Sequence, residues 1–144
     1  MVGNPQQQLD QQSTDPSLRR ELAERVFALP EVSEEPSRIS VLGARAQVLS
    51  EAAAVGPPEA LLIGREFAHL HPERDQSLHL SLPEEEADAA IESGWAELHP
   101  WSREGRIPPT RLLVCAPRDR GELEVVHSLV LDSYCFASSP PVSV

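Results

Sequence analysis

The strict alternation of apolar and polar residues over 77–82 (SLHLSL) constrains the fold of this chain more than any other feature. Side chains of a strand point alternately to its two faces, so the three leucines occupy one face, and the two serines and His79 occupy the other. The preceding run, 66–71 (EFAHLH), also alternates. The two runs predict an antiparallel hairpin that turns around residues 73–76.

The hydrophobic pattern also fixes the register of this hairpin. Pairing of Leu70 with Leu78 keeps the apolar side chains of both runs on one buried face. In this register His69 lies opposite His79, and His71 follows two residues along the same strand. Side chains in opposite positions have Cβ atoms about 5 Å apart, so three imidazoles are expected to converge. The polar face is expected to carry Phe67, His69, His71, Ser77, His79 and Ser81.

Capping residues and apolar periodicity predict three helices. A proline at the first helical position and acidic residues in the first turn mark the start of a helix, and a glycine marks its end. The first helix begins at Pro16 and ends at Pro30, and the second begins at Pro83 and ends at Gly94. The third opens with a capping box at Asp119.

Further strands are expected at 95–99 (WAELH), which alternates, and at 111–116 (RLLVCA), which is apolar on both faces like a central strand. Residues 31–36 (EVSEEP) are expected to form an acidic connector. Residues 37–55 are compatible with a helix or a strand, and the sequence leaves this open. The predicted class is α+β, with a mainly antiparallel sheet of about four to five strands and helices packed on one face.

A chain of 144 residues and 15.8 kDa accommodates one domain. Residues 1–14 are polar and are expected to form a disordered tail, residues 15–138 a single domain, and residues 139–144 a short C-terminal tail. Only 4% of the residues are aromatic, so the core must be aliphatic. Cys115 and Cys135 lie in apolar stretches without metal-binding spacing and are expected to be buried thiols.

Arginine supplies every cationic side chain, because the chain contains no lysine. This excludes a Schiff-base lysine, covalent pyridoxal phosphate and a P-loop lysine. The net charge of -11 argues against nucleic-acid and membrane-surface partners and leaves a small-molecule ligand as the expected partner, with the oligomeric state open. No signal peptide or membrane-spanning run is recognisable, so a cytoplasmic location is expected.

Histidine is the residue type that points to chemistry. The parity of 95–99 places Trp95, Glu97 and His99 on one side of their strand, which would add to the histidine-rich face if that side faces the hairpin. Grouped imidazoles can bind a transition metal, relay protons near neutral pH or hydrogen-bond an enolic or phenolic ligand. The competing interpretation is a solvated polar face, above all for His79. His127 lies apart, on the last predicted helix.

Four segments, in order and spacing, carry a family resemblance: 61–72 (LLIGREFAHLHP), 77–83 (SLHLSLP), 91–100 (IESGWAELHP) and 129–137 (LVLDSYCFA). Together they resemble the luciferase-family domain, which includes the fungal bioluminescence luciferase and small bacterial proteins. The positions that match the family pattern are Gly64, Glu66, His69, His71, Pro83, Glu97, His99 and Tyr134.

This resemblance implies oxidoreductase chemistry in which molecular oxygen adds to a hydroxylated pyrone, followed by decarboxylation, without a dissociable organic cofactor. We expect His69, His71 and His99 to bind and deprotonate an enol or phenol. Arg65 is expected to stabilise the developing anion. Residues expected to contact the substrate are Glu66, Phe67, His79, Trp95, Glu97 and Tyr134, the last as a hydrogen-bond donor.

Two alternatives stay open from the sequence alone. One is a metal-dependent enzyme that uses His69 and His71 as ligands, and the other is a non-catalytic ligand- or partner-binding module. Replacing the histidines abolishes turnover in an enzyme but changes only affinity in a binding module. No cofactor is expected, and molecular oxygen enters only as a co-substrate of the oxygenation. No residue is assigned as a metal ligand, and the sequence leaves a bound metal open.

Overall fold

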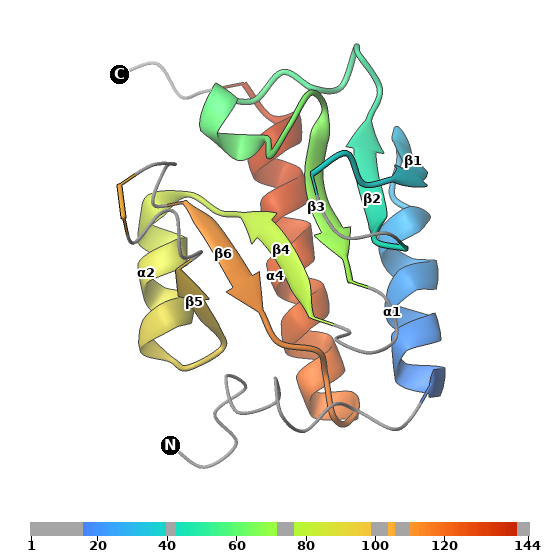
Figure 1. Cartoon of the computed structure of the whole chain (residues 1–144), viewed down its shortest axis with the longest axis vertical. Coiled ribbons are helices and arrows are strands. Elements are labelled where there is room, and N and C mark those ends of the chain that lie inside the picture. The colour runs from blue at the N-terminus through green and yellow to red at the C-terminus, as the bar shows by residue number, and fades with distance from the viewer. Residues whose placement is uncertain (1–15, 40–42, 72–76, 99–103, 106–109, 141–144) are drawn as a thin grey trace.

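The centre of the structure is a sheet of six strands (Figure 1). The computed structural model describes residues 16–39, 43–71, 77–98, 104–105 and 110–140. All strand pairs are antiparallel, and the order is β1-β2-β3-β4-β6-β5. The predicted α+β class is therefore confirmed, with slightly more strands than expected. The strands are β1 (Val32–Pro36), β2 (Arg45–Leu49), β3 (Glu66–Leu70), β4 (Leu78–Ser81), β5 (Ala96–Leu98) and β6 (Arg111–Val114).

The helices pack on one face of this sheet, as predicted. They are α1 (Pro16–Phe27), α2 (Glu84–Glu92) and α4 (Arg120–Ser138), and a short 3-10 helix, η2 (Pro58–Ala60), precedes β3. Figure 1 shows α4 behind β3 and β4, with α1 beside it. We call the opposite side of the sheet, which faces the viewer in Figure 1, the open face.

The core lies between the sheet and the helices and is aliphatic. Fully buried leucines of β3 and β4 contribute to it together with apolar residues of α1, α2 and α4. Phe67 is the only phenylalanine, tyrosine or tryptophan among the largest fully buried side chains of the described residues. The leucines of the 77–82 alternation therefore do what their spacing predicts.

The structure corrects the expectation for one segment and decides between the two alternatives for another. Residues 31–36 were expected to be a connector but contain β1, an edge strand that tolerates charge because its outer side faces solvent. Its Glu34 pairs with Arg45 of β2, with a closest N–O distance of 2.7 Å. The ambiguous stretch 37–55 contains β2, whose buried Gln47 donates a hydrogen bond to the Val26 carbonyl of α1 at 2.9 Å.

The expectation that both cysteines are buried is wrong for one of them. Cys115 is buried as predicted, whereas Cys135 is exposed. Residues 123, 126, 130, 133 and 137 of α4 are buried, and position 135 falls on the other side of this helix.

Among the described residues no helix is long and apolar enough to cross a membrane. The predicted tail over residues 1–14 lies outside the described residues.

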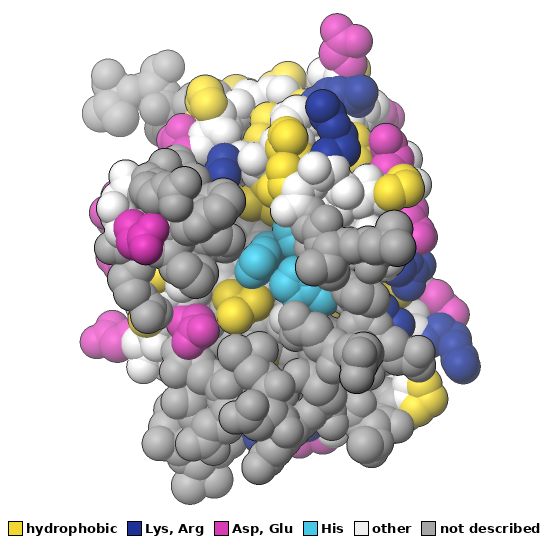
Figure 2. Space-filling view, viewed as in Figure 1, with side chains coloured by type: hydrophobic (Ala, Val, Ile, Leu, Met, Phe, Trp, Pro, Cys, Tyr) yellow, Lys and Arg dark blue, Asp and Glu magenta, His cyan; other side chains and the backbone are white. Residues whose placement is uncertain are grey.

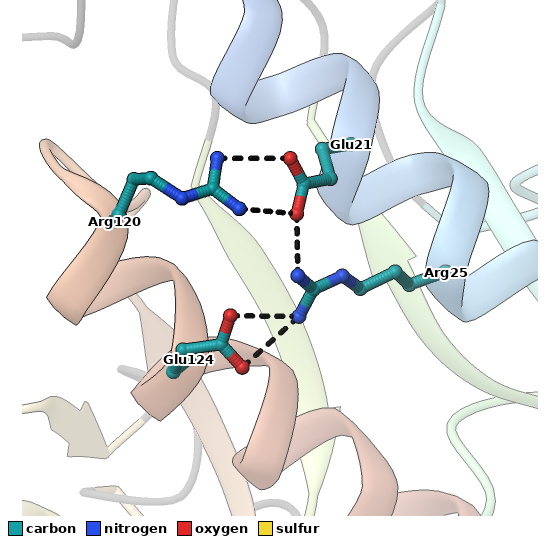
Figure 3. Close-up of polar contacts among 4 residues, drawn as sticks. All are labelled: Glu21, Arg25, Arg120 and Glu124. Atoms are coloured by element: carbon teal, nitrogen blue, oxygen red, sulfur yellow. Dashed lines mark hydrogen bonds and ion pairs between the residues drawn. The ribbon is translucent and has the colours of Figure 1, made fainter.

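Ion pairs join α1 to α4 (Figure 3). Arg120 makes two hydrogen bonds to Glu21, at 3.0 and 2.8 Å, and Arg25 contacts both Glu21 and Glu124. The hydrogen bond from Arg120 is the main cause that lowers the pKa of Glu21. Because these side chains are partly exposed, solvent screening keeps the contribution of each ion pair to stability small.

The segment around η2 covers one end of the open face. The Ser81 hydroxyl donates to the Glu59 carbonyl at 2.5 Å, and the Thr110 hydroxyl reaches the same carbonyl at 3.2 Å. The Gly56 amide donates to the Ala137 carbonyl of α4 at 2.9 Å. Gly56 thus holds the start of this segment against α4.

Gly56→Ala is expected to destabilise the fold by about 2 kcal/mol, because overpacking against backbone cannot be relieved by a rotamer change. An added Cβ would lie 2.2 Å from the Phe136 carbonyl oxygen. The matched control is Gly121→Ala, where the nearest atom to the new Cβ is 3.4 Å away. Urea unfolding of both variants measures the effect, and equal midpoints would contradict it.

Candidate functional site

Three histidines meet at the middle of the open face. His69 of β3 pairs with His79 of β4 and Leu70 pairs with Leu78, which is the register that the sequence predicts. The ring centroids are 5.0 Å apart for His69 and His79, 5.1 Å for His69 and His71, and 4.7 Å for His71 and His79. We call these three residues the histidine cluster.

A β-bulge in β3 determines which side chains join this cluster. Gln47 of β2 pairs with Ala68, but the next residue, Val48, pairs with Glu66, so Phe67 is the extra residue of the bulge. The bulge shifts the alternation by one residue. Glu66 therefore lies on the same side as His69, three positions away.

The same bulge places Phe67 on the helix side of the sheet. Simple alternation placed it on the histidine face, whereas its ring lies 6.0 Å from that of Tyr134 on α4, within the hydrophobic core. The bulge is the physical reason for this correction, because it reverses the side of every residue before Ala68. The structure thus places Phe67 away from the histidine cluster.

Glu66 and His69 form a buried hydrogen-bonded pair. The distance from His69 Nδ1 to the Glu66 carboxylate is 2.8 Å, and the side chains are 1% and 2% exposed. Glu66 also accepts hydrogen bonds from the Ser37 hydroxyl at 2.8 Å and from the Arg38 amide at 3.3 Å. A carboxylate in its ionised form only accepts hydrogen bonds, so Nδ1 of His69 is the donor when it bonds to an ionised Glu66.

The other ring nitrogen of His69 is left without a partner. Its Nε2 atom is buried and has no hydrogen-bond partner among the described residues. A buried polar atom without a partner costs free energy, and native structures leave few of them. When Nδ1 donates to Glu66, Nε2 is left as a hydrogen-bond acceptor without a donor among the described residues.

His71 and His79 complete the cluster with different surroundings. His71 Nδ1 lies 2.9 Å from the Ser77 hydroxyl, and the two residues are also joined by a backbone hydrogen bond of 2.8 Å. Arg19 of α1 donates to the His71 carbonyl at 3.0 Å. His79 is the most exposed of the three, being only half-buried.

One nitrogen from each ring can be chosen so that all three lie within 4.8 Å of one another. Figure 2 shows the histidine side chains in a recess at the middle of the open face. Three converging imidazoles, two of them buried and one half-buried, suit a small ligand or a transition metal.

Glu97 shares this face at a distance from the cluster. His79 pairs with Leu113 of β6, and Leu113 pairs with Glu97 of β5, so the row across the sheet reads His69, His79, Leu113, Glu97. The apolar Leu113 separates the carboxylate of Glu97 from the imidazoles. Trp95 is half-buried immediately before β5, and His99 lies outside the described residues.

Two other predicted site residues are not brought to the cluster. Arg65 is exposed and donates to the Leu49 carbonyl of β2 at 2.6 Å. The Tyr134 hydroxyl donates to the Pro30 carbonyl at 2.9 Å, and its ring contacts Phe67 on the helix side of the sheet.

Sequence reasoning did not select two polar residues that the structure makes relevant. Ser37 supports Glu66 from a segment 29 residues earlier, and no local pattern announces such a contact. Arg111 pairs with Ser81 of β4 and thereby joins the side of the sheet that carries His79. The available signal for Arg111 was that it is the one charged residue of the otherwise apolar run 111–116.

The luciferase domain is the protein family that matches this chain, over residues 64–133. A luciferase of Armillaria gallica is 34% identical over 82 residues, which make up 56% of this chain and 31% of that protein. Luciferases of Armillaria mellea and Neonothopanus nambi are each 34% identical over 79 residues, or 54% of this chain and 30% of each relative.

The resemblance that the sequence motifs indicate is therefore confirmed, and the matched region includes β3, β4 and the histidine cluster. The chain spans less than a third of the length of these curated relatives. No solved structure matches it.

The geometry predicts the tautomer of His69. Nδ1 of this imidazole should be protonated and Nε2 bare, which a long-range ¹H–¹⁵N NMR spectrum at neutral pH distinguishes. Glu66→Gln should remove this preference because an amide both donates and accepts, whereas the exposed Glu51→Gln should preserve it. Protonation of Nε2 in the unmodified protein would contradict the pairing.

Proposed function

We propose that this chain binds an enolic or phenolic small molecule at the histidine cluster and promotes its reaction with molecular oxygen. The proposal starts from the match of residues 64–133 to the luciferase domain. The observation that carries the proposal is the buried Glu66–His69 pair, in which Nε2 of His69 has no hydrogen-bond partner among the described residues. The identity with proteins named luciferase supports oxygen chemistry.

In this proposal His69 is the general base. Nε2 accepts the proton of the substrate hydroxyl, and the negative Glu66 carboxylate stabilises the imidazolium that forms. His71 and His79 hold the substrate oxygen by hydrogen bonds. The resulting enolate carbon is electron-rich enough to be oxidised by oxygen, which is reduced to the peroxide level as the new carbon–oxygen bond forms. The distal peroxide oxygen then takes up a proton, which balances the addition.

His69→Ala is expected to lower the rate of oxygen consumption with a 3-hydroxy-2-pyrone by about 100-fold or more, because general-base catalysis contributes a factor of this order. An oxygen electrode measures the rate. The control is His127→Ala, since His127 lies on α4 behind the sheet. Unchanged turnover in a folded His69→Ala variant would refute the proposal.

The three-nitrogen geometry favours a second candidate, a metal-dependent enzyme. The ligand set would be His69, His71 and His79, whose nitrogens lie within 4.8 Å of one another. Metal-bound histidines commonly donate their other ring N–H to a carboxylate, as His69 does to Glu66. A divalent ion there would bind the substrate oxygen as a Lewis acid.

The metal content of the purified, tag-free protein separates the two candidates. If the histidines are ligands, mass spectrometry should find close to one equivalent of a transition metal, lost in His69→Ala/His71→Ala and retained in His127→Ala. If His69 acts as a base, all three proteins should contain no stoichiometric metal while the wild type turns over. Equal metal in all three would show that the histidines are not the ligands.

A further inference from the structure

Arg111 is a half-buried cation for which the described residues supply no counter-charge. Its side chain donates one hydrogen bond, from Nη2 to the Leu61 carbonyl at 2.9 Å, and its Nε is buried without a partner. No carboxylate of the described residues pairs with it. By contrast, glutamates pair with four other arginines: Arg25, Arg45, Arg118 and Arg120.

The sheet register places Arg111 on the open face. Arg111 pairs with Ser81 and Leu113 pairs with His79, so Arg111 is the diagonal neighbour of His79 across β4 and β6. Diagonal neighbours lie about 7–8 Å apart, which a long guanidinium side chain readily covers. Arg111 is therefore near enough to contact a small molecule that also touches the histidine cluster.

Keeping a guanidinium in this position is costly. Burial without a compensating anion disfavours the charged form and lowers the pKa of Arg111, yet arginine remains charged in proteins. Glu97, an acidic residue on the same face, is opposite Leu113 and forms no ion pair with Arg111. An anion supplied by a ligand would balance the charge.

We infer that Arg111 anchors a carboxylate of the small molecule whose hydroxyl meets the histidine cluster. The inference rests on the proposed function, and it adds the class of ligand: an enol or phenol with a carboxylate several ångströms from its reacting hydroxyl. A guanidinium binds a carboxylate through parallel, charge-assisted hydrogen bonds, and Arg111 has donors beyond the one that the Leu61 carbonyl accepts. Arg65, exposed and bonded to Leu49, does not have this relation to the cluster.

Calorimetric titration with a matched pair of probes tests this assignment. The probes are 3,4-dihydroxycinnamate and the neutral 4-methylcatechol, which share a catechol and differ in the carboxylate. The wild type should bind the cinnamate about tenfold or more tightly than the neutral probe, as expected for a hydrogen bond to a charged group. Arg111→Gln should bind both probes alike.

Two further variants control for charge and folding. Arg20→Gln makes the same change in net charge at an exposed position of α1 and should keep the wild-type preference. Arg111→Lys keeps the charge without the planar fork and should retain part of the preference, which covers the case that Arg111→Gln does not fold.

The outcomes separate this inference from the proposed function. Equal affinity of the wild type for both probes, or an undiminished preference in Arg111→Gln, would overturn the role of Arg111 and leave the histidine site standing. Failure of the wild type to bind either probe would overturn the role of Arg111 and the proposed phenolic site together.

Discussion

The hydrogen bond between Glu66 and His69 is the contact on which the organisation of the open face depends. It requires the bulge at Phe67, because only the bulge puts residues three positions apart on one side of β3. It also requires Ser37 and the Arg38 amide, which supply donors to a carboxylate that has lost its water. The same bulge turns Phe67 into the core beside Tyr134, so one irregularity builds both the site and part of its support.

The hairpin and the meeting of its histidines could be predicted because they follow from local periodicity. The leucines of β4 can be buried in only one parity, and a shift by one residue would move them all to the other side of the sheet. That requirement sets His69 opposite His79 without reference to any distant residue. The proline and glutamate start of α2 and the Asp119 cap of α4 are equally local signals.

The parts that could not be predicted depend on tertiary contacts. Nothing in the alternation of 66–71 reveals a bulge, so Phe67 was expected where Glu66 lies. The choice between Arg65 and Arg111 depends on which carbonyl each guanidinium meets, Leu49 or Leu61, and these lie in segments that the sequence did not place. The acidic residues of β1 concealed a strand because an edge strand needs no alternating apolar side chains.

Buried atoms of basic side chains that lack hydrogen-bond partners lie on the open face. Four buried side-chain atoms of the described residues lack hydrogen-bond partners. The two that belong to neutral groups, on Gln47 and Ser133, lie on the helix side, where water is excluded for packing. The two on basic groups, Nε2 of His69 and Nε of Arg111, lie on the open face. His69 is on β3 and Arg111 is on β6, and both strands pair with β4, so the sheet fixes the spacing of the two residues. A ligand that satisfied both would therefore be selected by its length as well as by its chemistry.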